Sequence, residues 1–161
     1  MDRWIDIHKI NRELDDVFFE RYLDNESNYY KKNCIELVVE IAELANETKC
    51  FKYWSVKSPI KDKVLEEYAD TITMILHFFT WFKIDLEDIP THYETEDVLL
   101  LFNKLFIDAS SMIENGNEEL VKKIFSNILY LGELLRFSED ELIDACYKKM
   151  NIIKERLNSE Y

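Results

Sequence analysis

The sequence predicts an all-α protein, a helical bundle of about six helices. Its 161 residues include only 2 glycines and 2 prolines, whereas the average usage is about 7% and 5%. Leu, Ile, Glu and Lys, which are good helix formers, are abundant. Apolar residues recur at intervals of three and four, the period of an amphipathic helix. A chain of this length can bury one core, so we expect a single domain over residues 1–161.

The first two helices are predicted from the spacing of their apolar residues. A first helix is expected at about residues 3–22, and its inward face comprises Ile5, Ile10, Leu14, Val17, Phe18 and Leu23. After the polar break DNESN, a second helix is expected at about 28–48. Its apolar stripe comprises Cys34, Leu37, Val38, Ile41, Leu44 and Ala45. The three cysteines of the chain lack zinc-type spacing, so we expect reduced packing residues.

A third helix is predicted to begin at Ser58-Pro59. Serine can cap a helix, and proline suits its first position. The inward face comprises Val64, Leu65, Tyr68, Ile72, Ile75, Leu76 and Phe79. This most apolar helix should end before a loop at about 85–90.

Capping residues define the last three helices. Thr95 is the expected cap of a fourth helix, which Asn-Gly at 115–116 ends. A fifth is expected at about 117–137, and Ser138 with Glu141 forms a capping box for the sixth. The fourth and fifth helices carry no recognisable motif and are expected to be scaffold.

The charge of the chain restricts its partners. Its 20 basic and 33 acidic residues give a formal net charge of −13, which repels nucleic acid and anionic lipid over most of the surface. We therefore expect neither nucleic acid nor membrane as a partner. The first residues lack the apolar stretch of a signal peptide, and no apolar run is long enough to span a bilayer. A cytoplasmic location is expected.

Four acidic residues form a ridge on the second helix. Glu36, Glu40, Glu43 and Glu47 are spaced by four, three and four residues, so they fall within roughly 60° of one another on the helix wheel. Like charges at this spacing cost about 0.2–0.5 kcal/mol per pair, and no lysine lies among them. By itself, the ridge also fits a solvated face of an acidic protein.

A second acidic pair strengthens the case for a metal site. Glu67 and Asp70 in LEEYAD share a face of the third helix. Two adjacent antiparallel helices can bring Glu40 and Glu43 opposite this pair, which gives a cage of hard oxygen ligands suited to Mg²⁺. Mg²⁺ sites often recruit substrate phosphates, so a phosphoanhydride substrate is predicted. Glu47, one turn further, is either another ligand or the acceptor of a proton from the attacking water.

These acidic pairs resemble a known signature. Glu40-x-x-Glu43 followed by Glu67-x-x-Asp70 is similar to the motif of the all-α nucleotide pyrophosphohydrolases, the superfamily of MazG and the dimeric dUTPases. The surrounding words ELANETKCFKYWS and KDKVLEEYAD look like the dimeric dUTPases in particular. The resemblance implies a homodimer that binds two or three Mg²⁺ per site through these four residues. It also implies hydrolysis of a nucleoside triphosphate, dUTP, to dUMP and pyrophosphate.

The C-terminal segment CYKKMNIIKERLNSEY resembles the family's phosphate-binding elements. The match places Lys149, Arg156 and Tyr161 in register, and Asn151 lies close to an asparagine of the motif. Lysine and arginine offset phosphate charge, and arginine can grip two oxygens at once. The alternative is an ordinary basic helix end.

Three further residues are candidates for substrate binding by resemblance. Asn11 in INRELDD stands where the family has a base-reading glutamine. Trp54 corresponds to an aromatic residue that stacks on the base or ribose, although it could instead be a core residue. Lys61 matches a family lysine and either contacts phosphate or is solvated. His77, in an apolar helix, is expected to be a packed, hydrogen-bonded imidazole.

Two alternative functions remain open from the sequence. The shorter Asn11 and the C-terminal departures leave room for another base, such as dCTP or a modified nucleotide. A different class is a non-catalytic acidic helical module that binds a protein partner. A panel of deoxynucleotides with Mg²⁺ distinguishes the three.

Overall fold

The computed structural model describes residues 1–89 and 95–159, and for Asp88 only the backbone. Within this part of the chain, six α-helices, one 3-10 turn and no β-strand are present. The elements are α1 (Asp2–Tyr22), α2 (Glu26–Thr48), α3 (Lys61–Phe82), η1 (Leu86–Asp88), α4 (Val98–Asn115), α5 (Glu118–Leu134) and α6 (Glu139–Ser159). The predicted all-α fold is confirmed. None of these helices is long and apolar enough to cross a bilayer.

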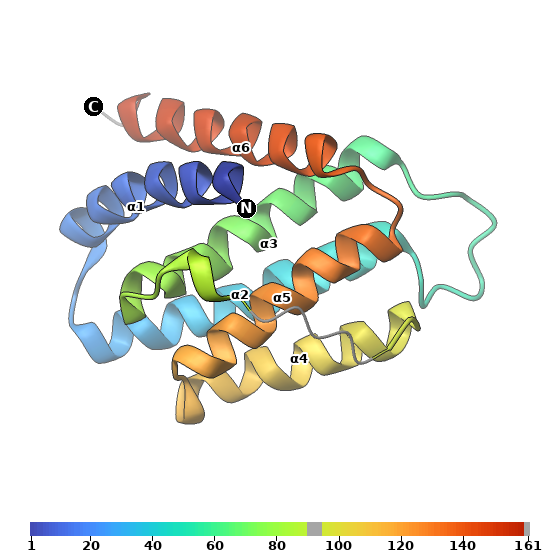
Figure 1. The fold of residues 1–161 in the computed structure, drawn as a ribbon, viewed down its shortest axis with the longest axis horizontal. Helices are drawn as coiled ribbons and strands as arrows, with labels where there is room; N and C mark the ends of the chain where they lie inside the picture. Colours follow the sequence, from blue (N-terminus) through green and yellow to red (C-terminus); the bar gives the residue numbers. More distant parts are fainter. Residues whose placement is uncertain (90–94, 160–161) are drawn as a thin grey trace.

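Helix α3 runs through the middle of the bundle (Figure 1). It packs against α1, α2, α5 and α6, while α4 packs on α2 and α5 at the lower edge of this view. α2 and α3 are antiparallel and joined by the extended connection on the right, and α1 lies beside α6. The centre of α3 is completely buried, at Tyr68, Ile72, Ile75, Leu76, Phe78 and Phe79. α3 is therefore the centre of the core, but the prediction that it is the most apolar helix is wrong, because α4 is more apolar on average.

Two helices begin at different caps from those predicted. α2 begins at Glu26, two residues early, because the side chain of Asn25 accepts a hydrogen bond from the backbone N–H of Asn28 at 2.8 Å. The prediction that Thr95 caps α4 is wrong. Asp97 is the cap, and its carboxylate accepts from the N–H groups of Leu99 and Leu100. The carboxylate reaches both N–H groups of the first turn, where negative charge is stabilising.

The predicted limits of α3 and α5 also need correction. α3 begins at Lys61 rather than at Ser58, whose carbonyl accepts a hydrogen bond from Lys49 Nζ at 3.0 Å outside the helix. α5 ends at Leu134 rather than Phe137, because Arg136 adopts the left-handed conformation with φ 62°.

The start of α6 matches the prediction. Ser138 N–H donates to Glu141 Oε2 at 3.0 Å, and Glu141 N–H donates to Ser138 Oγ at 3.2 Å, which is the reciprocal capping box. Cys34 and Cys146 are buried free thiols, as expected, and Cys50 is free and half-buried.

Candidate active site

Three carboxylates meet where α2 passes α3. One oxygen each from Glu40, Glu67 and Asp70 lies within 4.8 Å of the others. The buried hydroxyl of Thr71 lies 3.2 Å from the carbonyl oxygen of Glu40 and 2.9 Å from that of Glu67, and its single proton is shared between them. This hydroxyl ties the two helices together at the level of the carboxylates. The geometry provides hard oxygen atoms at the spacing of a metal site.

The three carboxylates are held at an electrostatic cost. Burial, and then the charges of Asp70, Glu43 and Glu36, raise the pKa of Glu40 to about 7. Burial also raises the pKa of Glu67 and of Asp70. Glu40 Oε2 is buried and has no hydrogen-bond partner among the described residues. A buried carboxylate oxygen without a donor is what a cation would satisfy, so the residues present fit a divalent metal ion.

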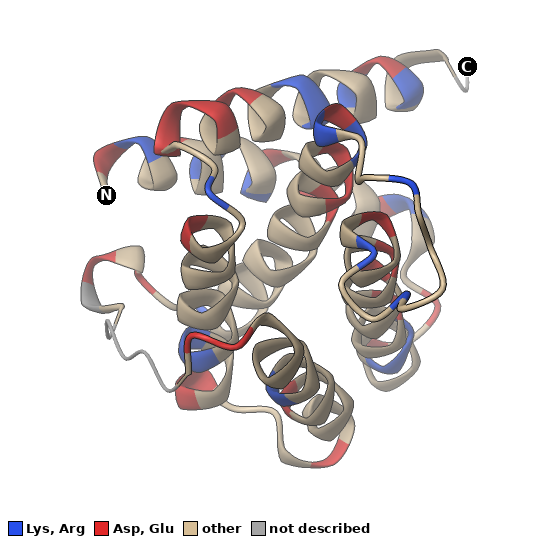
Figure 2. Ribbon diagram, turned by 90° about the vertical axis from the view of Figure 1, so that its right-hand side faces the viewer, with Lys and Arg blue, Asp and Glu red and all other residues tan. Residues whose placement is uncertain are grey.

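Lys149 from α6 reaches the cluster as its counter-charge. Its Nζ lies 2.5 Å from Asp70 Oδ1, and both side chains are largely buried, with 18% and 14% exposed. The bond to Lys149 opposes the rise in the pKa of Asp70. Figure 2 shows basic residues in the middle of α6 and along the α2–α3 connection. Lys149 is thus a basic side chain placed inside an acidic site.

A cavity of about 290 Å³ opens beside the carboxylates. Glu40, Asp70 and Lys149 line it together with Arg156 and Asn11. Its remaining walls are Leu14, Asp15, Phe18, Tyr29, Asn33, Glu36, Thr73, Met74, His77 and Ile153. Cavities of about 440 and 460 Å³ lie elsewhere, but none of the three clustered carboxylates lines them. The smaller cavity is the candidate substrate site because it combines acids, cations, polar groups and apolar walls.

Asp15 organises the polar side of this cavity. Its Oδ2 accepts hydrogen bonds from Asn11 Nδ2 at 3.1 Å and from Thr80 Oγ1 at 3.0 Å. Its Oδ1 lies 3.1 Å from Nδ1 of His77, whose side chain is only 9% exposed. The prediction of a packed, hydrogen-bonded His77 is confirmed. Asn11 is itself 3% exposed and also donates to the carbonyl oxygen of Thr73 at 3.3 Å.

Two predicted acids lie at the margin of the cluster. Glu43 is exposed and Glu47 is half-buried, and neither belongs to the group of three converging carboxylates nor lines the cavity. Their charges nevertheless contribute to the raised pKa of Glu67. The structure therefore brings three of the four proposed ligands into one cluster and leaves Glu43 beside it.

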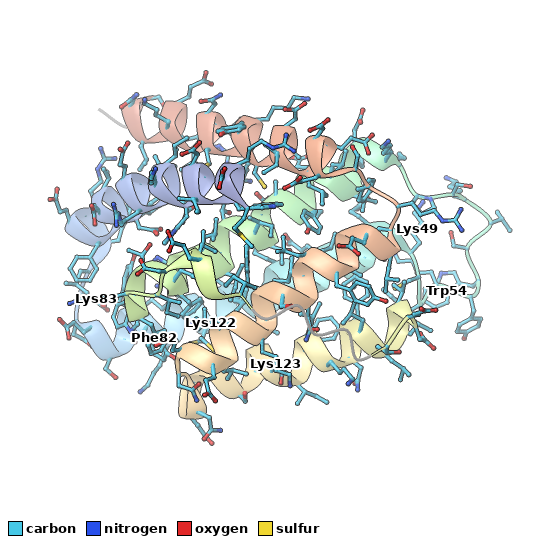
Figure 3. The ribbon with its side chains drawn as sticks, in the orientation of Figure 1. Lys49, Trp54, Phe82, Lys83, Lys122 and Lys123 are labelled. Carbon is cyan, nitrogen blue, oxygen red and sulfur yellow. The ribbon has the colours of Figure 1, made fainter. Side chains whose placement is uncertain are left out.

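Three predicted substrate-binding residues do not line the cavity, and one cannot be assessed. Trp54 is 63% exposed in the α2–α3 connection and lies far out at its tip in Figure 3, so the alternative that it is a core residue is wrong. Lys61 pairs with Glu141, and Asn151 is exposed on α6. Tyr161 lies outside the described residues.

Sequence reasoning missed Asp15 and Asn33, which line the cavity. Both belong to pairs four residues apart on one helix, Asn11 with Asp15 and Tyr29 with Asn33. For Asn33, the available signal was a polar amide at a position where the helical period predicts an apolar side chain, and for Asp15 it was the spacing of four residues from Asn11. Asn33 lies four residues before Leu37, on the buried face of α2.

The protein is an all-helical bundle with clustered carboxylates on two antiparallel helices. The cavity beside them also carries a lysine and an arginine. This is the architecture of the all-α nucleotide pyrophosphohydrolases. A sequence profile of the family described as dUTPase matches residues 3–161. The chain therefore belongs to the all-α dUTPase family, and it is a hydrolase of phosphoric anhydrides of the dUTP diphosphatase type. A search of curated proteins gives no significant match.

Proposed function

We propose that this protein hydrolyses dUTP to dUMP and pyrophosphate in a Mg²⁺-dependent reaction. The observation that carries the proposal is the convergence of Glu40, Glu67 and Asp70 beside a cavity lined by Lys149 and Arg156. Membership of the dUTPase family supports the choice of substrate.

Glu40, Glu43, Glu67 and Asp70 are the proposed metal ligands. The partnerless Oε2 of Glu40 and the raised pKa values of Glu40, Glu67 and Asp70 support a site that needs positive charge. Two or three Mg²⁺ ions, when bound, polarise the phosphate oxygens and lower the pKa of a water molecule. Glu43, exposed at the margin, is available to complete the ligand set.

The cations on α6 are proposed to hold the phosphate chain. Lys149 neutralises Asp70, and if Asp70 held a metal ion, the ammonium group would be available for a phosphate oxygen. Arg156 lines the same cavity about two turns further along α6, and its guanidinium can bind two oxygens in parallel. Glu47 is proposed to accept the proton of the attacking water, because it lies on the same ridge about one turn beyond Glu43.

Five further residues are proposed to contact the substrate. Asn11 lines the cavity and is proposed to bind the base. Asn151, Lys61, Trp54 and Tyr161 are proposed contacts that require rearrangement or a second subunit, since the first three lie outside the cavity.

We also propose that the protein is a homodimer through the outer faces of α2 and α4. Large apolar side chains are exposed there, including Ile35 at 55%, Val39 at 45% and Ile107 at 60%. Leu99, Leu100 and Ile113 extend the same set on α4. Several large apolar side chains exposed on two helices that pack together are typical of a subunit interface.

The experiment that tests the function is pyrophosphate release from each deoxynucleoside triphosphate with Mg²⁺. Glu43→Ala and Asp70→Ala are expected to lower dUTP turnover at least about 100-fold while the helices stay folded by circular dichroism, because both remove a proposed ligand. Glu66→Ala, which removes an exposed acid of α3 outside the carboxylate cluster, is the matched control for Asp70→Ala. Undiminished turnover in both variants contradicts the metal site, and a preference for dCTP or a modified nucleotide contradicts the base assignment.

A further inference from the structure

Asp15 makes three hydrogen bonds at the cavity but belongs to neither the carboxylate cluster nor the proposed phosphate contacts. Its partners are Asn11 on its own helix and His77 and Thr80 on α3. Its side chain is 14% exposed. A carboxylate so enclosed, with donors on both oxygens, has a fixed position.

This carboxylate determines how the amide of Asn11 is oriented. Asn11 Nδ2 donates to Asp15 Oδ2 and to the carbonyl oxygen of Thr73. A carboxylate and a backbone carbonyl are acceptors only, so both must face the NH₂ group and not the oxygen of the amide. The orientation of the amide therefore follows from the chemistry of its two acceptors.

With both amide protons occupied, Asn11 can offer the cavity only its carbonyl oxygen. Among the described residues, no donor to Asn11 Oδ1 is found. The side chain is 3% exposed and lines the same cavity as Lys149 and Arg156. A ligand that reaches Asn11 must therefore present an N–H or O–H donor to it.

The pyrimidine bases differ at this point. Uracil and its 5-substituted relatives carry an N–H at ring position 3, whereas cytosine carries a lone pair there. We propose that Asp15 is a positioning residue for base selection, which fixes Asn11 as an acceptor and so favours bases with an imide N–H over cytosine. This inference rests on the proposed function, because it assumes that the base occupies this cavity.

The test is the substitution Asp15→Asn, which replaces the obligate acceptor by a group that can also donate. The amide of Asn11 can then turn and present its NH₂ group. We expect the ratio of kcat/KM for dUTP to that for dCTP to fall about 10- to 100-fold, the range for losing or reversing one buried polar contact. The change should lie mainly in KM for dUTP. Asp16→Asn, at the exposed neighbouring acid, is the matched control and should leave the ratio unchanged.

A second variant separates positioning from a general structural effect. If Asp15 acts through Asn11, then Asp15→Asn has no further effect on the ratio in an Asn11→Leu background. Asn11→Leu alone should lower the ratio to a similar extent, which keeps the inference testable if Asp15→Asn does not fold. An additive effect in the double variant, or an unchanged ratio in Asn11→Leu, overturns the inference.

Binding without hydrolysis distinguishes this inference from the proposed function. Calorimetry with dUMP and dCMP in EDTA should show tighter binding of dUMP to the unmodified protein and loss of that preference in Asp15→Asn. Equal affinity for dUMP and dCMP overturns the inference even if dUTP is hydrolysed. Absence of all hydrolysis with a retained dUMP preference contradicts the proposed function only.

Discussion

Glu40→Gln should stabilise the metal-free protein while abolishing its activity. One carboxylate oxygen of Glu40 is buried and has no hydrogen-bond partner among the described residues. The negative charges of Asp70, Glu43 and Glu36 act on this carboxylate. Glutamine has nearly the same shape and carries no charge. The substitution therefore removes the desolvation cost of a buried charge and the repulsion of Glu40 by its neighbours, and it changes little in the packing of α2.

The magnitude follows from the raised pKa of Glu40. Its rise from 4.5 to about 7 sets an upper limit of about 3 kcal/mol for the destabilisation above pH 7. Glu40 is partly exposed, and solvent screening reduces this to about 1–2 kcal/mol. For a chain of this length, that corresponds to a rise of about 3–6 °C in Tm.

The pH dependence has a defined sign. The folded protein binds the Glu40 proton more tightly than the unfolded chain does, so stability falls as the pH rises from about 4.5 through 7. The Tm of the unmodified protein in EDTA should therefore be higher at pH 5.5 than at pH 8. The stabilisation by Glu40→Gln should be greatest at pH 8 and vanish near pH 4.5.

The assay is thermal denaturation followed by circular dichroism, in EDTA and in Mg²⁺, together with dUTP hydrolysis. Mg²⁺ should raise the Tm of the unmodified protein at pH 8 and have little effect on Glu40→Gln. Glu13→Gln, at an exposed acid of α1, should behave as the unmodified protein in both buffers. A lower Tm for Glu40→Gln in EDTA at pH 8, or an undiminished Mg²⁺ effect, refutes the reasoning.

Two other predictions concern α6 and the proposed dimer. Lys149→Met leaves the largely buried Asp70 without its counter-charge, so calorimetry in EDTA should show that the free energy of unfolding falls by about 1–3 kcal/mol. Mg²⁺ should partly restore this stability. An equal loss of stability in both buffers contradicts the counter-charge role. Val39→Lys and Ile107→Lys should each convert the dimer to monomers in sedimentation analysis. The control Ile152→Lys, at a similarly exposed position on α6, should leave the dimer intact. A monomeric unmodified protein contradicts the proposed interface.

The sequence predicts the fold well because its strongest signals are local. The apolar period of α3 and the capping box at Ser138 depend only on neighbouring residues, and both agree with the structure. The helix starts at Lys61 and Val98 were missed because each depends on a competition among nearby polar groups. Thr95 and Asp97 are both acceptable caps by type, and only the three-dimensional path of the chain decides between them.

The site was predictable to the extent that it follows helical spacing. Spacing identified the acids of α2 and α3, but it could not separate Glu40, which turns into the cluster, from Glu43, which stays exposed three residues later. The Asp70–Lys149 pair joins residues 79 positions apart only through the packing of α6 on α3. The network around Asp15 likewise depends on how α1 lies on α3, which no local pattern encodes.

The groups to which we assign separate roles lie on separate helices, and each of these helices packs against α3. α2 supplies Glu40, α6 supplies the cations, and α1 supplies Asn11 and Asp15, while α3 contributes a group to each of these contacts. α5 supports α3 from the opposite side, where the Tyr68 hydroxyl donates to the carbonyl oxygen of Ile128 at 2.9 Å. A Cβ at Gly132 would come within 2.9 Å of that hydroxyl oxygen. Because Tyr68 adjoins Glu67 in sequence, close packing of α5 helps to set the position of the carboxylate cluster without any residue of α5 entering the cavity.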